Sequence, residues 1–148
     1  METNNPLNLH ESRFDRPFVG VIDTDKKGYF MFQTLEHGFY AALVTLNRMD
    51  LDDYSVSCCI TRWPDSPLNP VEYDLFGDTL PVVSNSPLVP YTEVTTFICR
   101  QLRCAPQDLM CPSFYKDFLL YLARLEQNYY DPRWSIALEN QLSKFLSK

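Results

Sequence analysis

Glu36 is the residue of this chain best placed for acid catalysis. Phe32, Phe39 and Tyr40 surround it in the sequence, so we expect its carboxyl group in apolar surroundings. Such surroundings favour the protonated form of a carboxyl group, and a protonated carboxyl group can donate to a glycosidic oxygen. The same position also suits a glutamate that only stabilises the first turn of a helix. The sequence leaves both roles open.

Glycosidic-bond cleavage commonly also involves a second carboxylate and side chains that bind the sugar, and the sequence offers candidates for both. Glycosidases commonly use a second carboxylate, and Glu126 is the candidate for it. Because Arg124 lies nearby, a solvated helix face or a salt bridge is the structural alternative for Glu126. The candidate substrate-binding residues are Asn5, Asn8, His37, Tyr40 and Trp63.

Each candidate substrate-binding residue also has a structural interpretation. Asparagine side chains can bind an acetamido group, but Asn5 and Asn8 can equally hold a turn. Aromatic rings can stack on sugar rings, whereas core packing is the default for Trp63. His37 can orient Glu36 or a substrate hydroxyl group, or it can satisfy local hydrogen bonds.

The spacing of the cysteines in the sequence does not match that of a metal site. There are five, at positions 58, 59, 99, 104 and 111, and they lack the paired spacing of a zinc site. His10 and His37 do not complete such a spacing. We therefore predict no metal, no cofactor and five free thiols, with Cys59 and Cys99 on apolar helix faces. A nucleophilic Cys–His pair stays open, although no flanking motif supports it.

Length and composition indicate one folded domain over residues 1–148. The chain is 45% hydrophobic and long enough to bury a core. Its formal charge of −6 argues against general nucleic-acid binding, which depends on neutralising phosphates. No apolar run reaches the length of a transmembrane helix. The polar start of the chain lacks a signal peptide, so we expect synthesis in the cytoplasm.

The elements that must position these residues are mostly helices. Apolar residues at helical spacing predict a helix over 35–48 with Thr34 as its N-cap. A second helix is predicted from a cap at Asp52 or Asp53 to Trp63. Before them, residues 19–21 and 29–32 can pair as strands across a turn at 23–28.

The second half of the chain begins with a proline-rich segment and continues with helices. Six prolines between 64 and 90 predict a long loop. Helices are then predicted around 94–102, after a cap at Ser113, and from Asp131-Pro132, where an N-cap precedes proline at the first helical position. Pro106 can start a short helical turn. The predicted fold is mainly α, of the α+β type, with a small β or irregular N-terminal lobe.

Several short motifs, spread from Asn5 to Asn128, resemble one known family. That family consists of phage and prophage virion structural proteins related to the lysozyme superfamily. Its hallmarks are Asn-Pro-Gly-Asn-Ile-Arg, a Gly-Phe-x-x-Phe patch, Glu-x-Gly-x-x-Ala at a helix start, a short helix ending in Arg-Trp-x-Pro, and a late helix bearing a Glu before Asn-Gly. The matching segments here are Asn5-Pro6-Leu7-Asn8-Leu9-His10, Gly28-Tyr29-Phe30-Met31-Phe32, Glu36-His37-Gly38-Phe39-Tyr40-Ala41, Arg62-Trp63-Pro64 and Leu125-Glu126-Gln127-Asn128.

The resemblance implies a lysozyme-like fold and two alternative functions. One is a peptidoglycan glycosidase or lytic transglycosylase with Glu36 as general acid, acting on glycan strands. The other is a non-catalytic virion-structural or protein-interaction module, using the segment 64–90 and exposed aromatics as a contact surface. The polar run that follows the family's tryptophan is reduced here to Leu68-Asn69, which favours the second alternative. The retained Glu36-His37-Gly38 favours the first.

Overall fold

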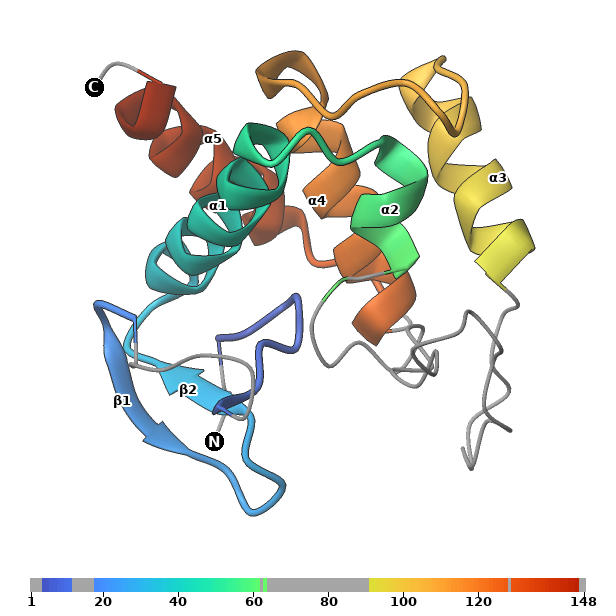
Figure 1. Ribbon diagram of the computed structural model, residues 1–148. Helices are drawn as coiled ribbons and strands as arrows, with labels where there is room; N and C mark the ends of the chain where they lie inside the picture. The colour runs from blue at the N-terminus through green and yellow to red at the C-terminus, as the bar shows by residue number, and fades with distance from the viewer. Residues whose placement is uncertain (1–3, 12–17, 62, 64–90, 128, 147–148) are drawn as a thin grey trace.

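The computed structural model describes residues 4–11, 18–61, 63, 91–127 and 129–146. Five helices and a two-stranded antiparallel sheet are present in these ranges, with the sheet at one end of the helical body (Figure 1). The predicted mainly α, α+β fold class is therefore confirmed. The proline-rich segment 64–90, for which a loop is predicted, lies outside the described residues.

The small β lobe is a hairpin of β1 (Val21–Thr24) and β2 (Phe30–Phe32), in agreement with the predicted pairing. Its turn is held by the Asp25 carboxylate, which accepts hydrogen bonds from the backbone N–H groups of Lys27 and Tyr29. Val19, which was expected in the first strand, precedes β1 in a turn and is 73% exposed. The other edge of β2 is lined by the N-terminal segment, where the Phe30 N–H donates to the Leu9 carbonyl.

Helix α1 (Leu35–Leu51) is the predicted first helix, three residues longer than expected. The Thr34 side chain caps it by accepting from the His37 N–H, as predicted. Its buried face packs against α4 (Pro112–Gln127) and α5 (Pro132–Leu146). A buried phenol joins α1 to α4, because the Tyr115 hydroxyl group donates to Asp50 Oδ2 at 2.6 Å. Burial, followed by this hydrogen bond, raises the pKa of Tyr115.

The remaining helices occur where they were expected, but two of the predicted caps are wrong. Helix α2 (Val56–Thr61) is preceded by Ser55, whose hydroxyl oxygen accepts from the Cys58 N–H. Asp53, a predicted cap, instead follows α1 with a φ of 60°. Helix α4 begins at Pro112, and the carbonyl of Cys111 accepts its first hydrogen bond, so Ser113 is inside the helix and is not its cap. Proline at the first helical position costs no hydrogen bond.

Three further expectations for the second half of the chain have clear outcomes. Helix α3 (Tyr91–Leu102) covers the predicted stretch. Helix α5 begins at Pro132, and Asp131 caps it through a hydrogen bond from the Arg133 N–H, as predicted. Residues around Pro106 form a turn closed by a hydrogen bond from the Asp108 N–H to the Ala105 carbonyl, and no helix forms there.

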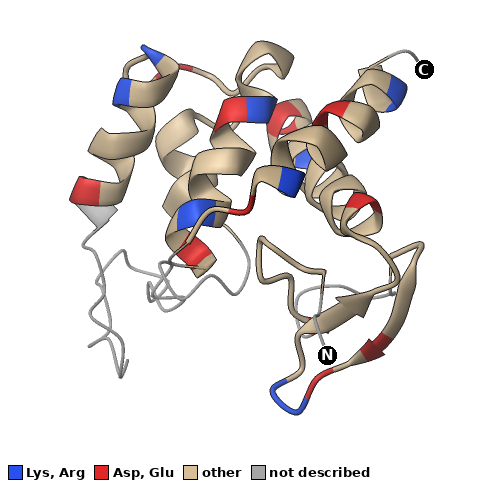
Figure 2. Cartoon of the chain, turned by 180° about the vertical axis from the view of Figure 1, so that it is seen from behind, with Lys and Arg blue, Asp and Glu red and all other residues tan. Residues whose placement is uncertain are grey.

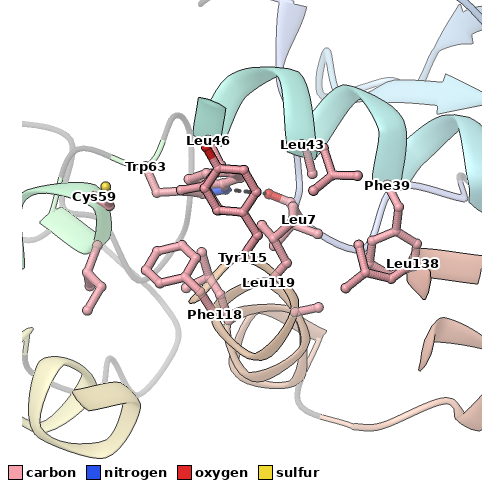
Figure 3. Close-up of a cluster of buried hydrophobic side chains, with 14 of the residues drawn as sticks. Leu7, Phe39, Leu43, Leu46, Cys59, Trp63, Tyr115, Phe118, Leu119 and Leu138 are labelled. Carbon is pink, nitrogen blue, oxygen red and sulfur yellow. Dashed lines mark hydrogen bonds between the residues drawn. The ribbon is translucent and has the colours of Figure 1, made fainter. Parts of the chain in front are cut away.

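The core lies where the N-terminal segment, α1, α4 and α5 meet (Figure 3). Side chains from all four elements are almost completely removed from solvent, which supplies most of the free energy that stabilises such a domain. They include Leu7, Phe39, Leu43, Leu46, Phe118, Leu119 and Leu138, and Trp63, which follows α2, packs among them. The N-terminal segment is thus an integral part of the core, because Leu7 and Leu9 are as buried as the helical residues.

Candidate functional site

Asn5 holds the N-terminal turn together from inside the protein. Its side chain is 4% exposed, and its amide nitrogen donates to the carbonyls of Leu9 and Phe30 at 2.9 and 3.0 Å. The amide oxygen accepts from the Leu9 N–H at 2.9 Å. Both donor hydrogens of the amide are therefore used, one within the turn and one to β2. This arrangement matches the structural interpretation of Asn5 and leaves no amide hydrogen for a sugar.

Asn8, Glu126 and Gln127 form a cluster that we call the N-terminal clasp. The Asn8 amide donates to Glu126 Oε2 at 2.9 Å, which links residues 118 positions apart in the sequence. The Gln127 amide donates to Asn8 Oδ1 and to the Pro6 carbonyl, both at 3.0 Å, and to the Asn5 carbonyl at 3.3 Å. The clasp thus fastens the C-terminal end of α4 to the N-terminal turn.

The role of Glu126 in the clasp differs from that of a general acid. A general acid must present a proton to the leaving oxygen. Oε2 of Glu126 instead accepts a hydrogen bond from the Asn8 amide. This contact makes Glu126 an anchor for the N-terminal turn.

Glu36 lies on a different face of α1 from the one that meets the N-terminal segment. That face is marked by Gly38, where an added Cβ atom would lie 2.1 Å from the Asn4 carbonyl oxygen. Successive residues of a helix are rotated by roughly 100° about its axis. The side chain of Glu36 therefore leaves the helix about 160° away from the direction in which a Cβ atom at Gly38 would point. The structure therefore brings Asn8 and Glu126 together but does not bring Glu36 to them.

The surroundings of Glu36 are those of a partly exposed helix position. Its side chain is half-buried, one helical turn before Tyr40. Within the described residues, no hydrogen bond or ion pair involves its carboxylate. The Tyr40 ring meets Phe145 of α5 edge to face, with 6.5 Å between the ring centroids. Glu36 and Tyr40 thus share the side of α1 that is turned to the end of α5.

His37 takes part in the start of α1. Its Nδ1 lies 2.8 Å from the Thr34 hydroxyl oxygen, which also accepts from the His37 N–H at 3.2 Å. The ring packs closely on Gly20, where an added Cβ atom would lie 2.3 Å from the imidazole carbons. Gly20 also has a φ of 90°, which side-chain-bearing residues rarely adopt. Both the close contact with the His37 ring and this backbone conformation therefore exclude a side chain at position 20. His37 therefore connects the helix cap with the turn before β1.

Trp63 is a core residue. Its side chain is 0% exposed, and its Nε1–H donates to the Leu7 carbonyl at 3.1 Å, as drawn in Figure 3. The ring lies against Phe118 of α4, with the ring centroids 6.2 Å apart. A sugar platform needs an exposed ring face, whereas both faces of this indole are covered.

An exposed aromatic group at the α4–α5 connection was not predicted from the sequence. Tyr129 and Tyr130 are 58% and 44% exposed, and their rings lean on the buried ring of Trp134. The guanidinium group of Arg124 lies 5.8 Å from the centroid of the Tyr130 ring and 5.9 Å from that of Tyr121. We call Arg124, Tyr129 and Tyr130 the tyrosine patch. The sequence signal that could have predicted this patch is the pair of adjacent tyrosines directly before the helix start at Asp131-Pro132.

Charge does not single out another site in the part of the chain that the structure describes. Figure 2 shows Lys and Arg spread over several helices and the β1–β2 turn. Among these residues, no group of three or more His, Cys, Asp or Glu side chains is arranged to hold a metal ion. No described helix is long and apolar enough to cross a membrane.

All five cysteines lie in the described ranges and are free. Burial raises the pKa of Cys59 to about 12, and it raises that of Cys99 to about 12 as well. Burial also raises the pKa of Cys104. A thiol with a raised pKa stays protonated at neutral pH and is a poor nucleophile. The environment of these three cysteines therefore does not resemble that of a catalytic thiolate.

Comparisons with known proteins leave the family resemblance as an interpretation of the motifs. Neither a scan against protein-family models nor a search of curated protein sequences gives a match to this chain.

Proposed function

We propose that this chain is a non-catalytic relative of phage lysozyme-like glycosidases, serving as a virion-structural or protein-interaction module. The observation that carries the proposal is the N-terminal clasp. The carboxylate and amides that were candidates for glycan chemistry are hydrogen-bonded to one another and to the backbone. Releasing them for a ligand would break hydrogen bonds between part-buried polar groups, which costs free energy.

The other candidate residues support the same proposal. Trp63 is enclosed in the core, so its indole ring offers no sugar platform. The side-chain amide of Asn5 donates both of its hydrogens to backbone carbonyl groups. A fold of this kind retains the architecture of a glycosidase while its polar groups act as internal supports. The family's motifs then persist here for structural reasons.

The tyrosine patch is the contact surface that suits an interaction module best. Tyrosine and arginine are enriched at protein interfaces, where they contribute much of the binding free energy. Tyr129 and Tyr130 already lean on Trp134, so little side-chain entropy is lost when a partner covers them. Arg124 precedes the clasp residues Glu126 and Gln127 in the sequence, and Tyr129 and Tyr130 follow them. The clasp therefore also steadies the part of the chain that presents the patch.

A second candidate function rests on Glu36. Its carboxylate is half-buried, has no hydrogen bond within the described residues, and lies one turn before Tyr40. These features leave its carboxyl group available to a ligand. A glycosidase that used Glu36 as its general acid would have to work without Glu126 as its second carboxylate.

The two candidates differ in the release of muropeptides from purified peptidoglycan. The wild-type protein is expected to release none between pH 4 and 8, and Glu36→Gln is expected to behave identically. The same substitution should change the free energy of unfolding by only about 0.3–1 kcal/mol, the value of an acidic residue at a helix N-terminus. Chromatography of the soluble products and a urea titration measure the two quantities.

An active lysozyme on the same substrate is the positive control. Release by the wild type that falls by ~10²–10⁴-fold in folded Glu36→Gln would overturn the proposal, since that is the loss expected when a general acid is removed. Release by both proteins at the same rate would point to a contaminating enzyme, which a repeat with independently purified protein removes.

A further inference from the structure

Arg124 of the tyrosine patch is held by a chain of aromatic contacts that runs through three helices. Its guanidinium group lies over the rings of Tyr121 and Tyr130, at 5.9 and 5.8 Å from their centroids. Each of these rings is supported by a further ring. Phe97 of α3 meets Tyr121 edge to face, with 5.6 Å between the centroids, and Trp134 of α5 supports Tyr130 at 6.0 Å. These contacts restrict the guanidinium group before any partner binds.

The charge of Arg124 is not matched by a carboxylate within the residues that the structure describes. The next two acidic residues of the chain have other partners. Glu126 accepts a hydrogen bond from the Asn8 amide, and Asp131 accepts from two nitrogens of the Arg133 guanidinium group. A cation–π contact does not neutralise a guanidinium group, which can still bind a carboxylate through two parallel hydrogen bonds. Arg124 thus presents an exposed positive charge beside two exposed tyrosine rings.

We propose that the tyrosine patch binds a partner protein through a segment that combines apolar side chains with an aspartate or glutamate. The carboxylate of that residue accepts hydrogen bonds from the Arg124 guanidinium group in a bidentate pair. The exposed rings of Tyr129 and Tyr130 pack on the apolar side chains of the same segment. A partner of this kind presupposes the proposed function of the chain as an interaction module.

The charge of the whole chain favours this partner over the other anions that arginine binds. A formal charge of −6 repels nucleic acid, and it opposes a doubly charged phosphate group more strongly than one carboxylate. The same charge opposes the approach of a second copy of the chain. A segment with one acidic residue among apolar residues adds the least repulsion and still neutralises Arg124.

The test selects binders from a displayed library of random peptides on the immobilised full chain and measures their affinity as synthetic peptides by fluorescence polarisation. We expect the enriched peptides to contain aspartate or glutamate beside apolar residues. Arg124→Gln, which changes an exposed side chain, should weaken their binding by about 10-fold or more. Arg124→Lys keeps the charge but cannot form the bidentate pair, so its affinity should lie between those of Arg124→Gln and the wild type.

Arg48→Gln is the matched control, because it removes the same charge from an exposed position near the other end of α4. Arg48 lies two residues before Asp50, which binds Tyr115 near the start of α4, whereas Arg124 lies in the last turn of that helix. Arg48→Gln should bind the peptides as tightly as the wild type. Peptides in which an amide replaces the carboxylate should bind the wild type and Arg124→Gln equally, because the pair that Arg124 forms is then already absent.

Enriched peptides without acidic residues, or affinities that Arg124→Gln leaves unchanged, would overturn the proposal, and so would a library that yields no binder. Tighter binding of a phosphoserine version of the peptide would assign the patch to phosphate, and self-association that Arg124→Gln abolishes would assign it to a second copy. Either result contradicts the proposal. Binding that requires Tyr129 and Tyr130 but not Arg124 would remove the acidic partner and leave the interaction module standing. Muropeptide release that depends on Glu36 would instead overturn the module itself.

Discussion

Replacement of Trp63 by alanine is expected to lower the free energy of unfolding by roughly 3–5 kcal/mol. The indole is 0% exposed and packs against Phe118, so its removal leaves a cavity between the N-terminal segment and α4. It also removes the donor to the buried Leu7 carbonyl. Urea denaturation followed by circular dichroism measures the change.

Trp63→Phe separates packing from the hydrogen bond. Phenylalanine keeps much of the apolar surface but cannot donate to the Leu7 carbonyl, so a smaller loss of about 1–3 kcal/mol is expected. If Trp63→Ala instead left stability unchanged and only weakened binding to a glycan, Trp63 would be a binding platform and its assignment to the core would be wrong.

Replacement of Phe39 by alanine is expected to cost roughly 3–5 kcal/mol as well. Phe39 is 0% exposed on the face of α1 that packs against α4 and α5. Figure 3 shows its side chain directed toward Leu138 of α5, in the same cluster as Leu43. The cavity would therefore open between α1 and α5.

Leu51→Ala is the matched control for Phe39→Ala because both residues belong to α1. Leu51 is 75% exposed at the end of the helix, so its truncation should stay within about 0.5 kcal/mol of the wild type. Equal losses from the two substitutions would contradict the assignment of the buried face of α1.

The helices were predictable because their signals are local. Leu35, Phe39 and Leu43 repeat at helical spacing and define α1 before any tertiary contact is known. Asp131-Pro132 marks the start of α5 with equal clarity. The wrong caps show the limit of such signals. Asp53 and Ser55 are both good N-cap types, and only the path of the chain between α1 and α2 makes Ser55 the cap.

The candidate site was only partly predictable because its contacts join distant parts of the chain. The motif match identified Asn8 and Glu126 as residues of interest, but no periodicity reveals that their side chains meet. Gln127 was not a candidate, although its amide makes three hydrogen bonds to the N-terminal segment. Glu36 was predicted beside aromatic residues in sequence, and helix geometry then directs it away from Glu126. Such pairings depend on the assembled fold.

The proposed function requires the claim that the N-terminal clasp is a structural support, and a double-mutant cycle of Asn8 and Glu126 tests that claim most directly. Asn8→Gly is the suitable change at residue 8, because glycine tolerates its φ of 53°, and Glu126→Ala removes the partner carboxylate. The two substitutions should be coupled by roughly 1–2 kcal/mol in the free energy of unfolding, as expected for a part-buried hydrogen bond to a carboxylate. A coupling free energy of zero would contradict the claim.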